Sequence, residues 1–156
     1  MKKLLTIILL CWGFSLIFAQ ESEKPASEKQ SKELVFVVNA TAKIWDNISA
    51  KDLKKIYLGK TKNLKGIRLR PTLRHDEDLN RGFLDKYVGK SPRRFKSYWI
   101  KKVFSRGGEK PKEIGQIADL LDYISEHEGA IGIAWSDELT GEEKSVKTLE
   151  IAPRDK

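Results

Sequence analysis

Two short apolar runs, LVFVV (34–38) and AIGIAW (130–135), most constrain what this chain can fold into. The first is rich in β-branched residues and is typical of a strand buried on both faces of a sheet. The second predicts another strand, with Gly132 at a point of close backbone approach. Strands alternate with helical segments along the chain, which predicts an α/β domain with a central sheet covered by helices.

Four helices are expected between these two strands. Ser49 and Asp52 form a capping-box pair, so the first helix begins near Ala50 and ends at Gly59. Apolar spacing predicts a second helix over 77–88. A third begins at Ser91 and Pro92, and a fourth lies around 117–124. The apolar face expected to pack inward from the third helix consists of Phe95, Tyr98, Trp99 and Val103.

Two further extended segments are indicated. GIRLRPTLR (66–74) contains Pro71, which favours a strand end or an edge position because proline cannot donate to a ladder. VKTLEI (146–151) alternates in polarity and predicts an edge strand.

The N-terminal residues predict export. Lys2 and Lys3 precede an apolar run that ends at Ala19, the pattern of a signal peptide over residues 1–19. A retained membrane anchor is the alternative, but the run is shorter than the roughly 20 residues that a span needs. Residues 20–33 are expected to be a flexible linker, 34–152 the folded domain and 153–156 a tail. A periplasmic or secreted location follows.

The net charge of the chain limits which classes of partner are expected. Lys2 and Lys3 account for two of the formal +8 charges, so the chain without its leader carries about +6. For an exported protein this excess favours anionic lipids, envelope polymers or small anions over nucleic acid. A basic surface that serves solubility alone is the alternative.

The stretch LRHDEDLNRGF (73–83) is where an extended segment runs into a helix. Helix starts hold anions because their N–H groups are free and the helix dipole favours negative charge. Asp76, Glu77 and Asp78 instead place carboxylates there, which can cap the free N–H groups themselves. Both an anion site and a capped helix start therefore stay open.

Other chemistry receives little support from the residues. His75 and Asp76 are adjacent, but no nucleophile stands in a recognisable motif, so we expect no enzyme. The cluster at 126–128 has one His and no second ligand set, so we expect no metal site there, and no cofactor is predicted. The basic residues of RRFKSYWIKK (93–102) are expected on the solvent side of an amphipathic helix.

Three pieces of the chain resemble phosphate-type periplasmic solute-binding proteins: FVVN (36–39) with SAKDLKKIYLGK (49–60), VGKSPRRFKSYWIKKVF (88–104) and EHEGAIGIAW (126–135). IYLGK (56–60) and GAIGI (129–133) are the most specific parts. The similarity implies a type II periplasmic-binding-protein fold, with a mixed central sheet and flanking helices. It also implies binding of a small anion, phosphate among them, for an ABC-type uptake system. The chain is long enough for one lobe, so the resemblance implies a second lobe or a membrane transporter as partner.

The family places an arginine, an aspartate and then Gly, Ser, Gly and Thr at the helix start that binds phosphate. Arg74 and Asp76 keep the residue types, while Glu77, Asp78 and Leu79 replace three of the small residues. The ligand-binding residues implied by this alignment and by their donors and acceptors are Arg74, His75, Asp76, Asp78, Asn80 and Arg81.

Two hypotheses follow. In the first, the exported domain binds a small anion such as phosphate. In the second, it has kept the fold but lost the ligand, and it binds a partner protein or an anionic polymer in the cell envelope. The basic charge and Arg74 favour the first, and the loss of the family's Ser, Gly and Thr at 78–80 favours the second.

Overall fold

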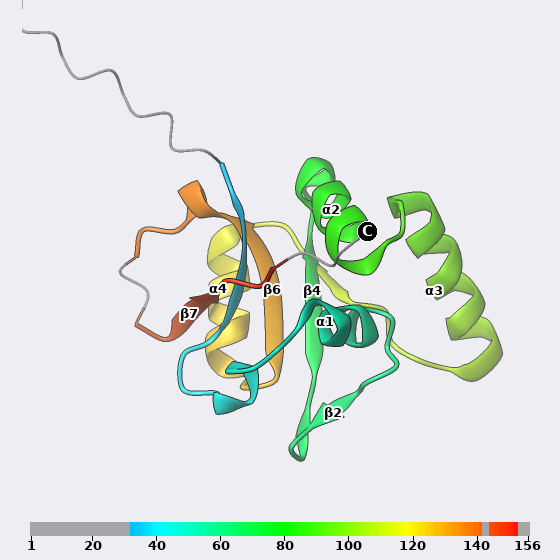
Figure 1. The fold of residues 1–156 in the computed structure, drawn as a ribbon, viewed down its shortest axis with the longest axis horizontal. Coiled ribbons are helices and arrows are strands. Elements are labelled where there is room, and N and C mark those ends of the chain that lie inside the picture. The colour runs from blue at the N-terminus through cyan, green and yellow to red at the C-terminus, as the bar shows by residue number, and fades with distance from the viewer. Residues whose placement is uncertain (1–31, 142–143, 153–156) are drawn as a thin grey trace, which may run out of the picture. The chain divides into compact units, whose positions relative to one another are not determined.

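A central five-stranded sheet organises the part of the chain that the computed structural model describes, residues 32–141 and 144–152. The predicted signal peptide, most of the predicted linker and the predicted tail lie outside these residues. The strand order is β5-β4-β6-β1-β7. β4 is parallel to β5 and β6, whereas β1 is antiparallel to β6 and β7. The predicted α/β class with a mixed sheet and flanking helices is confirmed (Figure 1).

The elements have the following bounds. The strands are β1 Leu34–Asn39, β2 Asn63–Leu64, β3 Ile67–Arg68, β4 Arg70–Arg74, β5 Lys112–Ile114, β6 Ala130–Trp135 and β7 Val146–Leu149. The α-helices are α1 Ala50–Tyr57, α2 Glu77–Phe83, α3 Pro92–Arg106 and α4 Ile117–Glu126. Short 3-10 helices lie at Lys43–Trp45 and Ser136–Glu138, and a π-helical turn at Leu84–Val88 continues α2.

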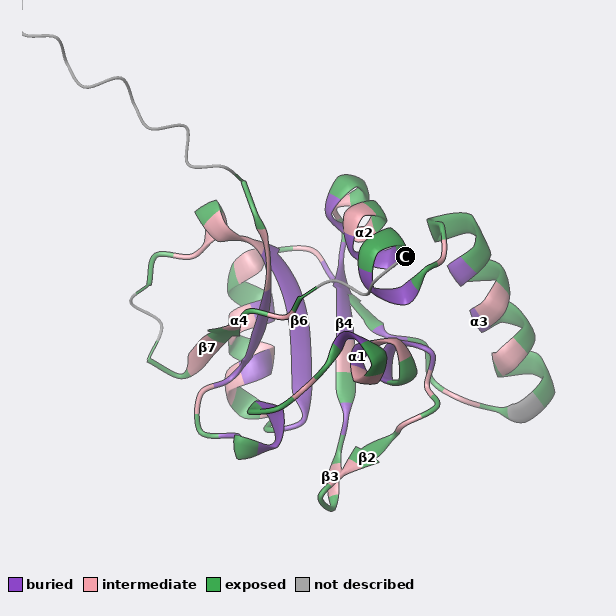
Figure 2. Ribbon diagram, in the orientation of Figure 1, coloured by how far each residue is buried: buried purple, intermediate pink, exposed green. Residues whose placement is uncertain are grey.

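The two faces of the sheet bury separate apolar clusters. Side chains alternate along β1, so Phe36 and Val38 join the larger cluster, which includes residues of α1 and α2. Val37 faces the other way and packs in a smaller cluster with Leu120 and Ile124 of α4. Residues of β6 also divide between the two clusters, so β1 and β6 are both covered on both faces. They are the most uniformly buried part of the sheet (Figure 2). The prediction of β1 as a buried core strand is confirmed.

Local signals in the sequence determine several boundaries. The Ser49 and Asp52 capping box is present: Ser49 Oγ donates to Asp52 Oδ2 at 2.6 Å, and α1 begins at Ala50 as predicted. The helical stretch from α2 through the π-helical turn ends at Gly89, whose φ of 73° is in the left-handed region. β7 lies at the edge of the sheet as predicted.

Of the two positions predicted for Pro71, a strand end or an edge strand, only the edge strand is wrong, because β4 lies between β5 and β6. Pro71 is the second residue of β4, next to the start of the strand, and is paired with Ile131. The Arg70 N–H donates to the Gly129 carbonyl on the β6 side, so the nitrogen of Pro71 faces the β5 side. The pairing with β5 begins one residue later, at Thr72, and no ladder bond is lost there. A short neighbouring strand thus accommodates the proline.

The predicted inward face of α3 is only partly correct. Phe95 and Trp99 are buried, and Tyr98 is half-buried. Val103 is 41% exposed, and its neighbour Phe104 is 87% exposed. The final turns of α3 extend past the core, beside the edge of the sheet (Figure 1).

Lys102 was expected on the solvent side of α3, and this too is wrong. Its Nζ donates to the carbonyl oxygens of Leu58 and Gly59 at the end of α1, at 2.5 and 2.8 Å. The same ammonium lies 5.0 Å from the ring centroid of Trp99. Lys102 therefore caps α1 with positive charge, where the helix dipole is negative.

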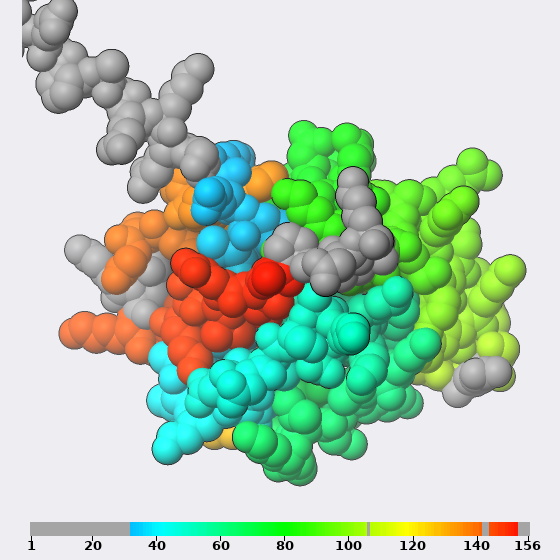
Figure 3. Space-filling view, viewed as in Figure 1, coloured from blue at the N-terminus to red at the C-terminus, as the bar shows by residue number. Residues whose placement is uncertain are grey.

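The segment after β7 lies against the core. On the face shown in Figure 3 it lies between the first residues of the domain and the region of α1. Tyr87 donates to the Ile151 carbonyl at 3.0 Å, and Leu149 and Ile151 pack on the larger cluster. Among the described residues, no helix combines the length and hydrophobicity that crossing a membrane requires.

Candidate functional site

The candidate site lies where β4 and β6 end. The two strands are parallel neighbours, with Arg70 opposite Ala130, so their carboxyl ends meet at one edge of the sheet. β4 ends at Arg74, β6 ends at Trp135, and the 3-10 helix Ser136–Glu138 follows directly. In α/β sheets such an edge is a common place for ligands.

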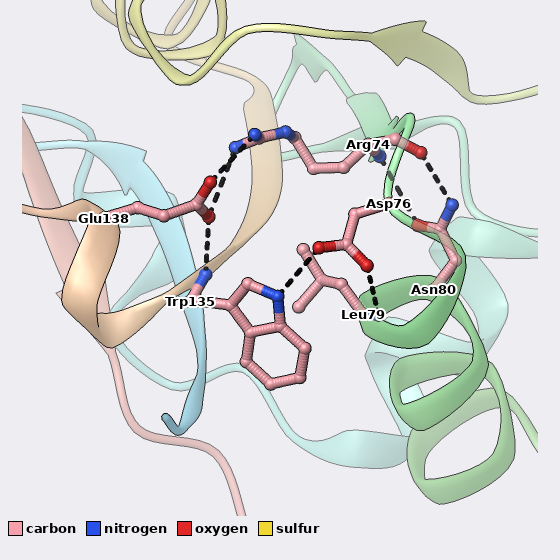
Figure 4. Close-up of polar contacts among 6 residues, drawn as sticks. All are labelled: Arg74, Asp76, Leu79, Asn80, Trp135 and Glu138. Carbon is pink, nitrogen blue, oxygen red and sulfur yellow. Dashed lines mark hydrogen bonds and ion pairs between the residues drawn. The ribbon is translucent and has the colours of Figure 1, made fainter. Parts of the chain in front are cut away.

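Arg74 is buried and paired with an internal carboxylate. Only 6% of the residue is exposed, and its Nη2 and Nη1 atoms donate to the two oxygens of Glu138 at 3.0 and 3.5 Å (Figure 4). The Trp135 N–H donates to the same carboxylate at 2.9 Å. Glu138 therefore accepts from three donors, and it neutralises the one buried arginine among the described residues.

The pairing leaves one donor of Arg74 unused. Its Nε atom is buried and has no hydrogen-bond partner among the described residues. An unpaired buried N–H costs about 1–3 kcal/mol, so this atom favours an additional acceptor at the site.

Asp76 closes the start of α2. Its Oδ1 accepts from the Leu79 N–H at 2.9 Å, and its Oδ2 accepts from the indole Nε1 of Trp135 at 2.8 Å (Figure 4). These bonds, that from Leu79 first, hold the pKa of Asp76 below its usual value of 3.8. Lys32 adds a positive charge nearby, with its Nζ 4.9 Å from the Trp135 ring centroid.

Asn80 fixes the turn between β4 and α2. Its Nδ2 donates to the Arg74 carbonyl at 2.6 Å, and its Oδ1 accepts from the Arg74 N–H at 3.4 Å. The side chain is thus committed to the backbone of Arg74. Together these bonds hold Arg74, Asp76 and Asn80 in one cluster with Trp135 and Glu138 (Figure 4).

The other three predicted site residues lie outside this cluster. Asp78 and Arg81 are exposed and form an ion pair of 3.2 Å with each other on the surface of α2. His75 is exposed as well, and its backbone N–H donates to the Ile114 carbonyl of β5 at 3.2 Å. The predicted ligand role of all six residues stays a prediction.

Two residues of this cluster, Trp135 and Glu138, were not among the predicted site residues. They are 59 and 64 residues from the side chains they contact. A signal was present: AIGIAW predicts a strand, and a glutamate three residues after its final tryptophan can bond back to the strand end, as the Trp135 N–H and Glu138 do here. Pairing that strand with 66–74 in parallel would have brought the two ends together.

Metal binding receives no support from the described residues. They contain no group of three or more His, Cys, Asp or Glu side chains placed to hold an ion. His127, at the end of α4, lies with Nδ1 2.9 Å from the Tyr123 carbonyl. The arrangement at Arg74 can bind an oxyanion or an internal carboxylate, and in this structure the carboxylate of Glu138 has that place.

No family model and no curated protein matches the chain. Solved structures do match it. An ABC-type phosphate transport receptor from Vibrio cholerae aligns with a TM-score of 0.56 at 16% identity, over 77% of this chain and 46% of that one. PstS from Borrelia burgdorferi gives 0.55 at 14% identity, over 77% and 47%. A putative phosphate ABC transporter substrate-binding protein with bound phosphate, from Clostridium perfringens, gives 0.56 at 14%, over 77% and 45%.

These matches define the fold of the chain. It is a solute-binding-protein-like fold, and the chain spans about half the length of the matching structures, which is consistent with one lobe. The matching proteins are described as transport receptors or binding proteins and not as enzymes. The fold expected from the resemblance is thus confirmed.

Proposed function

We propose that this protein is an exported module with the fold of one binding-protein lobe, in which the Glu138 carboxylate stands in for the anionic ligand. One observation carries the proposal: both Nη atoms of the buried Arg74 are bound to Glu138. An incoming phosphate would have to break this charge-assisted pair and would meet the charge of Asp76 beside it. In this proposal the module does not carry free phosphate; it binds a partner in the envelope.

The surface of α3 supports an acidic partner protein. Helix α3 has no acidic residue, and Arg93, Arg94 and Lys101 are exposed on it. Ile100 and Phe104 are exposed on the same helix, at 49% and 87%. Exposed apolar side chains among cations fit a protein surface that combines acidic and apolar groups, and they fit an anionic polymer less well because it lacks the apolar part.

The first test is calorimetric titration with phosphate of the chain without its predicted signal peptide. We expect no binding by the natural sequence. Glu138→Ala removes the internal carboxylate and leaves Arg74 open. This variant should bind phosphate at least about tenfold more tightly than the natural sequence, a difference of about 1.4 kcal/mol in binding free energy. The double variant Arg74→Ala, Glu138→Ala is the control and should not bind.

Micromolar binding of phosphate by the natural sequence, lost in Arg74→Ala, would contradict the proposal. It would favour a second candidate function, uptake of a small oxyanion with displacement of Glu138. The unpaired Nε of Arg74 is the observation that favours this candidate, because a bound oxyanion supplies the missing acceptor.

A second test concerns α3. Reversing the charge of Arg93, Arg94 and Lys101 should abolish cross-linking to the partner in the envelope, and Arg74→Ala should leave it unchanged. Lys102 is left out of this variant because it holds the end of α1. Loss of cross-linking in Arg74→Ala alone would contradict a role of α3.

A further inference from the structure

A basic hollow lies at the end of β4 opposite to Arg74. It has a volume of about 320 Å³ and is lined by the end of α1 and the residues after it, the chain from Arg68 to Pro71, side chains of α3 and α4, and residues 108–112 after α3. Arg70 and Arg74 are four residue steps apart along β4, a distance of about 13 Å at 3.3 Å per residue. The hollow is therefore separate from the Glu138 site.

Positive charge dominates the lining of the hollow. Its cationic residues are Lys62, Arg68, Arg70, Lys102, Lys110 and Lys112, and Glu109 is its one acidic residue. These cations come from segments that are far apart in the sequence, so the fold brings them together. Like charges gathered around a concave surface raise the local potential and attract anions.

Internal partners occupy part of this charge. Arg68 pairs with Glu109 at 2.7 Å, and Lys110 pairs with Glu113 at 3.0 Å. Lys102 caps α1, and the Nζ of Lys112 lies 4.2 Å from the ring centroid of Tyr123. Both ion pairs are solvent-exposed and therefore weak.

Lys62 and Arg70 differ from the other cations. Both are exposed, and neither has an ion pair within the described part of the chain. The two residues lie close together on one side of the hollow. The Leu69 N–H donates to the Lys62 carbonyl at 2.8 Å, and Arg70 directly follows Leu69. These two side chains have charge available for a ligand.

The floor of the hollow is apolar. Ile56, Leu69 and Trp99 line it, and each is at most 7% exposed. A low-dielectric floor strengthens the attraction between the surrounding cations and a bound anion. A volume near 300 Å³ is at the lower end of what small-molecule sites in proteins have.

We propose that this hollow is a binding site for a small molecule that carries two or more clustered anionic groups. Lys62 and Arg70 contact the anionic groups, with Arg68, Lys110 and Lys112 contributing to the field around them. A single phosphate would engage only part of this charge, so a chain of phosphates or a polycarboxylate fits the hollow better. The site rests on the basic hollow alone and does not depend on the role of Arg74.

Calorimetric titration with inorganic tripolyphosphate tests the proposal, using orthophosphate and citrate for comparison. We expect one tripolyphosphate bound per chain and no measurable binding of orthophosphate by the natural sequence. The variant Lys62→Gln, Arg70→Gln should bind at least about tenfold more weakly, because two charge-assisted hydrogen bonds are lost. Binding of citrate as well as tripolyphosphate would assign the recognition to clustered charge, and binding of tripolyphosphate alone would assign it to phosphate groups.

The matched control is Lys51→Gln, Lys86→Gln, which removes the same charge from two exposed positions outside the hollow. It should retain the affinity within about twofold, as expected when screened charges lie far from a site. Equal losses in the two double variants, more than one tripolyphosphate per chain or no saturable binding would overturn the proposal. Arg74→Ala should leave tripolyphosphate binding unchanged, which separates this result from that of the phosphate test above.

Discussion

Asp76 has two structural tasks: it caps α2 and it accepts from the Trp135 indole. These hydrogen bonds, with that from Leu79 as the larger cause, lower its pKa. The folded chain therefore binds this proton less readily than the unfolded chain does. The charged form of Asp76 stabilises the folded state above its ordinary pKa, and this contribution is lost as the pH falls through the folded pKa.

Asp76→Ala is expected to lower the free energy of unfolding by about 1 kcal/mol at neutral pH, the usual worth of an N-cap. It should also reduce the loss of stability that the natural sequence shows on going from roughly pH 5 to pH 2. Urea unfolding at a series of pH values measures both effects. Glu77→Gln, which removes a charge from the first turn of α2 but leaves the Asp76 cap in place, is the control, and an equal effect there would contradict the role given to Asp76.

Gly132 of β6 lies where the neighbouring side chains leave no room for a Cβ atom. A Cβ at this position would lie 2.7 Å from Leu120 Cδ1 and 2.9 Å from Thr72 Oγ1, closer than real contacts allow. Gly132→Ala should therefore destabilise the protein by about 1–3 kcal/mol through overpacking between β6 and α4. Gly82 in α2 is the control, because nothing lies within 4 Å of a Cβ there. Gly82→Ala should gain up to about 1 kcal/mol, and thermal or urea unfolding of both variants checks the contrast.

At the level of elements, α3 combines a buried anchor with an exposed end. Trp99 is 5% exposed, and its Nε1 donates to the Tyr57 carbonyl at 3.2 Å, whereas Phe104 is almost fully exposed. Trp99→Ala should cost about 3–5 kcal/mol, as loss of a buried aromatic does. Phe104→Ser should change the free energy of unfolding by less than about 0.5 kcal/mol. Urea unfolding distinguishes the two, and a large loss in Phe104→Ser would show that this end of α3 is packed in solution.

The elements also show where sequence reasoning succeeded. Ser49, Asp52 and Gly89 act on backbone groups a few residues away, so their patterns predicted where helices begin and end. The environments of Pro71 and Val103 depend on segments that are distant in the sequence. Pro71 is tolerated in β4 because β5 is short and pairs only from Thr72 onward, and Val103 is exposed because α3 extends past the core. The Arg74 and Glu138 pair depends on the parallel register of β4 and β6, which composition alone does not determine.

Across the described domain, the central strands β1 and β6 are the most uniformly buried segments of the sheet. Ile131 and Ile133 of β6 are fully buried, as are Val37 and Val38 of β1, whereas β7 is half-buried and lies at the edge. Because local opening is easiest where few apolar contacts hold a segment, amides of β6 should exchange with solvent last and those of β7 earlier. Native-state hydrogen exchange tests this order, and equal protection of β7 and β6 would contradict it.

The bond between Arg74 and Glu138 has a consequence for competition at this edge of the sheet. Glu138 is attached to the same chain as the arginine it binds, so its local concentration is fixed by the three-residue helix that carries it and does not fall on dilution. A diffusing anion must therefore compete with the Glu138 carboxylate. The effective concentration of a group on a short tether is about millimolar or higher. Displacing the 3-10 helix Ser136–Glu138 would remove that carboxylate without any mutation and would leave both Nη atoms of Arg74 without their acceptor.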